Sequence, residues 1–91
     1  MEKLVAYKRM PVWNKDTMPE AVQRKHNTKV GTWGKITVLK GILKFIKLTE
    51  EGEVISEHFF KAGADNPMAQ PQAWHRVEAA TEDVEWYLEF Y

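Results

Sequence analysis

Apolar and polar residues alternate in a strand-like pattern along most of the chain from residue 35 onward. In residues 84–91, four apolar side chains at every second position share one face of an extended chain, and Glu85 and Glu89 share the other. Residues 35–39 and 42–48 are rich in β-branched and apolar residues and flank Lys40-Gly41, which predicts a β-hairpin. Residues 42–48 and 54–60 flank a polar, glycine-containing turn, which predicts a second hairpin.

One stretch before these strands is typical of a helix start. Thr17 is expected to cap the helix, with Glu20 three residues later completing a capping box and Pro19 in the first turn. We predict a helix of about two turns that continues through Val22 and Arg24.

Five or more short strands with one short helix near the start predict an all-β sandwich or small barrel. A further strand is expected over residues 74–79. The chain contains no low-complexity linker or repeat, so residues 1–91 are expected to form a single domain. Barrels of this size can hold one small ligand among inward-facing side chains.

Composition narrows the range of partners. Thirteen basic and thirteen acidic residues balance, so the attraction that nucleic acid or an anionic membrane requires is missing. The absence of cysteine excludes disulfides and thiolate metal sites. No apolar run has the length of a signal peptide or a membrane span, and we expect a soluble, cytoplasmic protein. The four tryptophans are expected to pack in the core and at the barrel ends.

The segment PQAWHRVEA, residues 71–79, contains the first candidate site residue. Alternation places His75 on one face with Val77 and Ala79, and Trp74, Arg76 and Glu78 on the other. The imidazole of His75 is therefore expected to point inward. It is either a metal ligand or general base, or a structural histidine bonded to a backbone carbonyl.

A metal site would need partners for His75. His26 and Glu78 would complete a two-histidine, one-carboxylate set that suits Zn, Fe, Mn or Ni. Alternation opposes Glu78 unless a bulge re-aims it, and the other interpretation is an ion pair with Arg76. His58 is expected at the surface or in a structural role.

A loose basic cluster near the start of the strand region is the other candidate for ligand binding. It is expected either to attract a small oxyanion or to be solvated, and its members are Arg24, Lys25, Lys29 and Lys35. The chain lacks a glycine-rich phosphate loop, a nucleophile elbow and a dinucleotide fingerprint, which excludes a cofactor-dependent transferase domain.

Several segments resemble the TehB/YeaR-like family of tellurite-resistance proteins, and the resemblance covers essentially the whole chain. They are residues 10–15 (MPVWNK), 25–35 (KHNTKVGTWGK), 38–41 (VLKG) and 71–78 (PQAWHRVE). The resemblance implies a cupin-like double-stranded β-helix, a small jelly-roll barrel, and a homodimer. It also implies that residues 71–75 correspond to the second cupin metal motif and His26 to one histidine of the first, whose partner position is Thr28. Long TehB proteins continue into a methyltransferase domain that this chain lacks, so methyl transfer is not expected of it.

Together these observations predict a cytoplasmic cupin-like module with a pocket around His26 and His75. It would bind a divalent metal or a small oxyanion and serve in tellurite or toxic-anion resistance or sensing. Two alternatives remain: a small metal-dependent cupin enzyme of the oxygenase or isomerase type, and a non-catalytic dimerisation domain.

Overall fold

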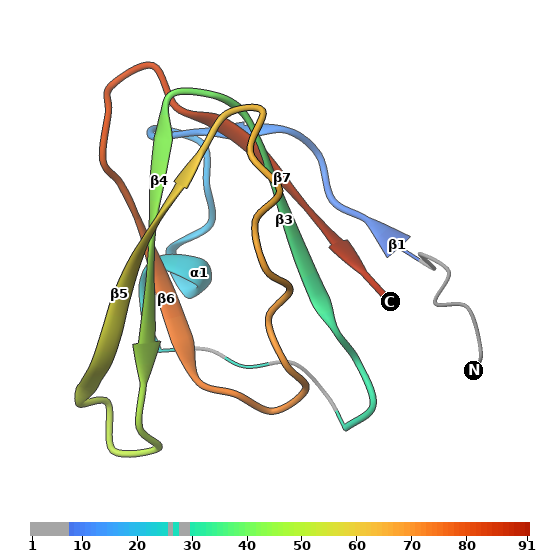
Figure 1. The fold of residues 1–91 in the computed structure, drawn as a ribbon, viewed down its shortest axis with the longest axis vertical. Coiled ribbons are helices and arrows are strands. Elements are labelled where there is room, and N and C mark those ends of the chain that lie inside the picture. The colour runs from blue at the N-terminus through green and yellow to red at the C-terminus, as the bar shows by residue number, and fades with distance from the viewer. Residues whose placement is uncertain (1–7, 26, 28–29) are drawn as a thin grey trace.

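The structure, a computed structural model, describes residues 8–25, 27 and 30–91. Within these residues the chain forms seven strands, joined by turns and loops, and one short helix (Figure 1). The all-β class predicted from the alternating pattern is therefore confirmed. The elements are β1 (Lys8–Arg9), β2 (Trp13–Asn14), α1 (Glu20–Gln23), β3 (Gly34–Lys40), β4 (Ile42–Leu48), β5 (Val54–Lys61), β6 (His75–Ala79) and β7 (Glu85–Phe90).

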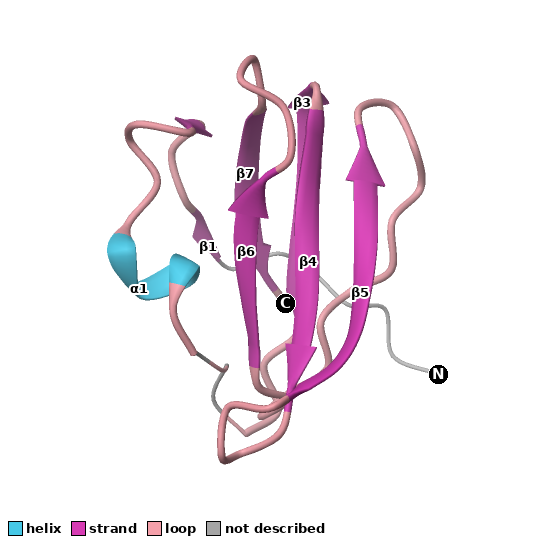
Figure 2. Ribbon diagram, turned by 90° about the vertical axis from the view of Figure 1, so that its left-hand side faces the viewer, coloured by secondary structure: helices cyan, strands magenta, loops and turns pink. Residues whose placement is uncertain are grey.

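The described strands form two antiparallel sheets. In the first sheet β7 pairs with β1, β2 and β3, and in the second β4 lies between β5 and β6. Figure 2 shows the second sheet face-on, with β5 and β6 on either side of β4. The predicted hairpin of residues 42–48 with residues 54–60 is confirmed by the pairing of β4 with β5.

The predicted hairpin of residues 35–39 with residues 42–48 is wrong. β3 pairs with β7, whereas β4 belongs to the other sheet. Gly41 stands between the two strands with a φ of 68°, so the chain turns a corner there and passes from one sheet to the other. The sharp turn predicted at Lys40-Gly41 is present, but a turn alone does not determine whether the two strands that flank it pair with each other.

Side chains from both sheets form one hydrophobic core. Trp13 and Trp86 meet edge to face with ring centroids 5.1 Å apart, and Phe45 stacks on Phe60 at 5.0 Å. Trp13 and Trp86 are buried, as expected of the tryptophans. Trp33 and Trp74 are only half-buried.

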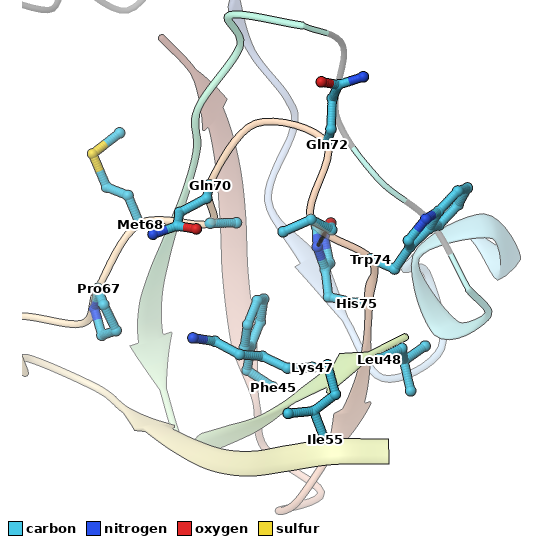
Figure 3. Close-up of a pocket in the computed structure, with 12 residues that line it drawn as sticks. Phe45, Lys47, Leu48, Ile55, Pro67, Met68, Gln70, Gln72, Trp74 and His75 are labelled. Atoms are coloured by element: carbon cyan, nitrogen blue, oxygen red, sulfur yellow. Dashed lines mark hydrogen bonds between the residues drawn. The ribbon is translucent and has the colours of Figure 1, made fainter. Parts of the chain in front are cut away.

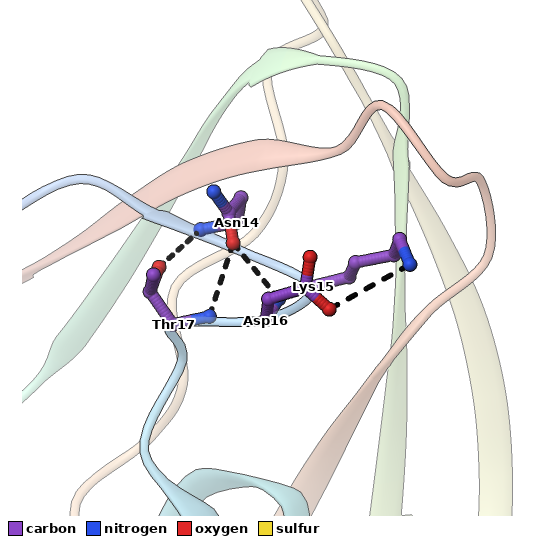
Figure 4. A network of polar contacts seen from close by, with 4 residues as sticks. All are labelled: Asn14, Lys15, Asp16 and Thr17. Atoms are coloured by element: carbon purple, nitrogen blue, oxygen red, sulfur yellow. Dashed lines mark hydrogen bonds and ion pairs between the residues drawn. The ribbon is translucent and has the colours of Figure 1, made fainter.

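The predicted capping of the helix is also wrong. The Thr17 hydroxyl accepts a hydrogen bond from the Asn14 N–H, and the Asn14 side-chain oxygen accepts bonds from the N–H groups of Asp16 and Thr17 (Figure 4). Thr17 therefore belongs to the turn after β2 and does not cap the helix. The helix follows Pro19 and is a single turn, because Arg24 is already extended.

In the described part of the chain, no helix has the length and apolar character of a membrane span.

Candidate functional site

A pocket of about 440 Å³ lies between the last part of β4, the start of β5 and the segment that leads into β6. Figure 3 shows side chains from these three elements around it. It is lined by Phe45, Lys47, Leu48, Ile55, Pro67, Met68, Ala69, Gln70, Gln72, Ala73, Trp74 and His75. The pocket adjoins the core, because Phe45 and Ala69 belong to both.

His75 is the buried polar residue of the pocket, with 5% of its surface exposed. It is the first residue of β6, and the alternation predicted for this strand is confirmed: His75 and Val77 are buried and Glu78 is exposed. The imidazole stacks against the ring of Phe45 at 5.1 Å. Its Nδ1 lies 3.0 Å from the carbonyl oxygen of Ala73. A carbonyl only accepts, so Nδ1 carries the hydrogen of this bond.

The turn before His75 shapes the rim of the pocket. Gln72 has a φ of 62°, a left-handed conformation that is uncommon for a residue with a side chain. The Ala73 N–H bonds to the Gln70 carbonyl, and the Leu48 N–H bonds to the Trp74 carbonyl. The first bond closes the turn and the second joins the segment before β6 to the end of β4, so that Gln70, Gln72 and His75 line one pocket.

The polar side chains that line the pocket are donors or amides. They are Lys47, Gln70, Gln72, Trp74 and His75, and the described lining includes no aspartate or glutamate. The Lys25 ammonium lies 4.4 Å from the centre of the Trp74 ring, which brings a second cation to the rim. A site with amine, imidazole and amide groups and no carboxylate favours a negatively charged ligand.

The structure brings only part of the predicted metal set to this pocket. His75 lies in it, whereas Glu78 is on the opposite face of β6 and forms an ion pair with Arg76, which was the alternative interpretation. His26 lies outside the described residues. Among the described residues, no three histidine, aspartate or glutamate side chains cluster as a metal site would require.

Other sequence candidates lie away from the pocket. His58 is exposed on β5, and a ring nitrogen lies 3.0 Å from the Ser56 hydroxyl, which confirms the surface role expected of it. The basic cluster does not assemble among the described residues: Arg24 pairs with Glu20, Lys35 lies opposite Glu89 in the sheet, and only Lys25 comes near the pocket. Lys29 lies outside the described residues.

Lys47, Gln70 and Gln72 are the pocket residues that the sequence analysis missed. For Lys47 a signal existed, because alternation in residues 42–48 puts Lys47 on the same face as Leu43 and Phe45, where a charge at the end of a buried row is unusual. The two glutamines reach the pocket only through the turn at residues 70–73, which no periodicity reveals.

Comparison with known proteins assigns the family. The profile of the TehB-like domain matches residues 8–88. TehB of Haemophilus influenzae (strain ATCC 51907 / DSM 11121 / KW20 / Rd), described as a probable S-adenosyl-L-methionine-dependent methyltransferase, is 61% identical over 89 residues, which are 98% of this chain and 31% of that protein. The chain thus spans about a third of this relative. YeaR of Escherichia coli (strain K12), described as uncharacterized, is 26% identical over 85 residues, covering 89% of this chain and 71% of YeaR.

Two solved structures share the fold. The crystal structure of TehB from Haemophilus influenzae superposes with a TM-score of 0.92 at 60% identity, covering 94% of this chain and 30% of that one. A crystal structure of a protein from Escherichia coli (strain K12) superposes with a TM-score of 0.85 at 25% identity, covering 99% and 95% of the two chains. The profile match and the 61% identity lead to one conclusion: this chain belongs to the TehB-like family.

Proposed function

We propose that the protein is a cytoplasmic, cupin-like module of the tellurite-resistance type that binds a small oxyanion in the pocket at His75. The observation that carries the proposal is the lining itself, which combines Lys47, His75 and Gln70 with no described carboxylate. Such a donor set attracts an anion and offers little to a divalent cation.

Each group has a distinct role in this proposal. Lys47 supplies a positive charge from β4, and Gln70 supplies a neutral N–H donor. The Gln72 amide points away from the other lining side chains (Figure 3). His75 donates from Nε2 when the ring is protonated, while its Nδ1 stays bonded to the Ala73 carbonyl and holds the ring in place. Phe45 and Trp74 form apolar walls, against which such bonds are stronger than in water.

A resident divalent metal fits the described residues poorly. Catalytic zinc and non-haem iron sites use three protein ligands, and the described pocket supplies one imidazole. The metal-dependent enzyme therefore stays a weaker candidate, and elemental analysis of untagged protein tests it. Stoichiometric zinc, iron, manganese or nickel that is lost in His75→Ala would replace the oxyanion proposal with a metal site that includes His26.

Tellurite is the first oxyanion to test, because of the family to which the chain belongs. Isothermal titration of the whole chain with tellurite, with sulfate and phosphate for comparison, should give saturable binding. Lys47→Gln and His75→Gln should each weaken binding by roughly tenfold or more, since each removes a charged or charge-assisted hydrogen bond.

Lys44→Gln is the matched control. It removes the same charge from the same strand, but Lys44 lies outside the pocket and pairs with Glu57 at 3.3 Å. Binding should be unchanged in this variant. Equal loss in Lys44→Gln and Lys47→Gln, or no binding of any of the three anions to folded wild-type protein, would refute the proposal. Thermal unfolding of each variant identifies any that fail to fold.

A further inference from the structure

β5 forms one edge of the second sheet. This strand of eight residues pairs with β4 along one side, and no described strand pairs with its other side. Figure 2 shows β5 at the border of the sheet, with β4 between it and β6. A long edge of this kind presents outward N–H and C=O groups, a template on which another strand can add. At the end of β5 the Lys61 carbonyl already accepts bonds from the Ala64 N–H and the Asn66 side-chain amide, at 3.2 and 3.4 Å.

Both faces of β5 are open to solvent over most of its length. Ile55 and Phe59 are exposed by 63% and 58%, and Ser56 and His58 hydrogen-bond to each other at the surface. Proteins usually protect a long edge strand with charges, proline or a covering segment. β5 carries the charged residues Glu57 and Lys61, and Glu57 pairs with Lys44 of its own sheet. Between these two charges the large apolar side chain of Phe59 lies exposed, which indicates a partner that pairs with the edge.

A second copy of the chain fits this edge in one register. A bulge between Lys47 and Leu48 interrupts the β4–β5 ladder opposite residues 54–56, so regular pairing is restricted to residues 56–61. Two copies that pair antiparallel about a two-fold axis at Phe59 place Phe59 against Phe59 of the second copy, and Glu57 against Lys61, twice. Aromatic pairs and opposite charges are the cross-strand pairs that stabilise sheets.

The neighbouring registers lack this complementarity. An axis at Glu57 places the two Glu57 carboxylates opposite each other, and an axis at His58 places Glu57 against Phe59. We propose that the protein forms a symmetric dimer by edge pairing of β5 about Phe59. The pairing joins two three-stranded sheets into one. Its short ladder makes the dimer weak and concentration-dependent, since stable interfaces bury on the order of 1,000 Å² or more.

Single cysteines test the register, because the natural chain has none. Phe59→Cys places two sulfur atoms across the axis, where the Cα separation of paired strands suits a disulfide. Under mild oxidation its yield of disulfide-linked dimer should exceed severalfold that of Glu57→Cys, His58→Cys and Val30→Cys. Val30 is exposed in a loop, so the yield of Val30→Cys gives the rate of disulfide formation by random collision. Preferential linkage at position 57 or 58, or yields at position 59 equal to those at position 30, would overturn the proposal.

Charge exchange tests the same contact without cysteine. Sedimentation of the wild-type chain over a concentration series should show a species of twice the 10.6 kDa of one chain. Lys61→Glu should shift the midpoint of the monomer–dimer equilibrium to at least severalfold higher protein concentration, since it places a second carboxylate opposite Glu57 of the other copy. Mixing Lys61→Glu with Glu57→Lys should restore association, because the mixed pair matches at both contacts. A chain that stays monomeric throughout, or a mixture that associates no better than its components, would rule out pairing at β5.

Discussion

At the scale of single residues, Glu89 shows how neighbouring strands set the environment of a side chain. It lies in β7 opposite Arg9 of β1 on one side and Lys35 of β3 on the other. Its carboxylate is nearly buried and accepts bonds from Nε and Nη2 of Arg9, at 3.2 and 3.0 Å. The Arg9 guanidinium also lies 4.8 Å from the centre of the Tyr87 ring. These contacts make Glu89 the attachment point of β1.

Removing the cation should destabilise the protein, because it leaves a buried carboxylate without its partner. We expect Arg9→Leu to lower the melting temperature by more than Lys8→Leu, the change at the exposed neighbour in the same strand. Equal melting temperatures for the two variants, measured by circular dichroism, would show that β1 is not held by this pair.

The pH dependence of the decrease in melting temperature on Arg9→Leu is set by the pKa of the Arg9 guanidinium. The hydrogen bond and charge of Glu89 raise the pKa of Arg9 above its ordinary value. A raised pKa in the folded state means that the stabilisation is complete below the unfolded value and is lost only as pH rises through the higher folded value. The difference in melting temperature between wild type and Arg9→Leu should therefore be the same at about pH 7 and about pH 9. A difference that shrinks over this interval would contradict this assignment.

At the scale of elements, the corner at Gly41 separates the two sheets. A Cβ placed there would lie 2.2 Å from Oγ1 of Thr81 and 2.6 Å from Oδ1 of Asp83. The Thr81 hydroxyl accepts a hydrogen bond from the N–H of Ile42, the first residue of β4. Any side chain at position 41 must displace that contact as well as adopt a left-handed backbone.

Gly41→Ala should thus cost more than the conformational penalty alone. Gly63 offers the matched control, because its φ of 75° is also left-handed and nothing lies within 4 Å of its Cβ position. We expect Gly63→Ala to lower the free energy of unfolding by about 1–2 kcal/mol. Gly41→Ala should lower it further, and chemical denaturation measures both. Equal decreases in the free energy of unfolding for the two variants would mean that displacing the Thr81 hydroxyl does not destabilise the protein.

The longer strands of this fold were largely predictable from the sequence, whereas of their pairings only the β4–β5 hairpin was. Alternation located β4, β5, β6 and β7 within a residue or two, because burial of one face requires it. The partner of β3 is β7, which lies far along the chain, and the residues near β3 in the sequence do not predict that pairing. The Thr17 cap failed for a related reason, because its hydroxyl bonds within the turn after β2.

At the scale of the whole molecule, both sheets depend on one core. Trp13 and Trp86 enter it from the first sheet, Phe45 and Phe60 from the second, and Leu43 has no exposed surface. One cluster that joins side chains of both sheets favours cooperative unfolding.

We therefore expect tryptophan fluorescence and far-ultraviolet circular dichroism to report one coincident denaturation curve. Leu43→Ala should shift both probes together and lower the free energy of unfolding by about 2–5 kcal/mol, the cost of a large-to-small change in a core. The exposed Leu39→Ala is its control. Separate transitions for the two probes would show that the sheets unfold independently.

The candidate site was predictable only in part. The inward position of His75 followed from alternation behind a proline turn, and the exposed Arg76–Glu78 pair followed from the same pattern. The two glutamines of the rim and the end of β4 come close to His75 only in the folded protein. The chain reverses its direction at Gln72, which has a left-handed backbone conformation. The spacing of residues along the sequence does not predict that these residues lie close to His75. The role of His26 stays a prediction.

The position of β7 at the centre of the first sheet has a consequence for synthesis. β1, β2 and β3 each pair with β7 and with no other described strand, although β7 follows all of them in the chain. During synthesis β4, β5 and β6 can therefore pair with one another as soon as they have left the ribosome. The three earlier strands, β1, β2 and β3, can pair only after residues 85–90 have also been made. Until that last strand emerges, Trp13, Ile36 and Val38 have no ladder to hold them over the core, and this interval is when a nascent chain most needs protection from aggregation.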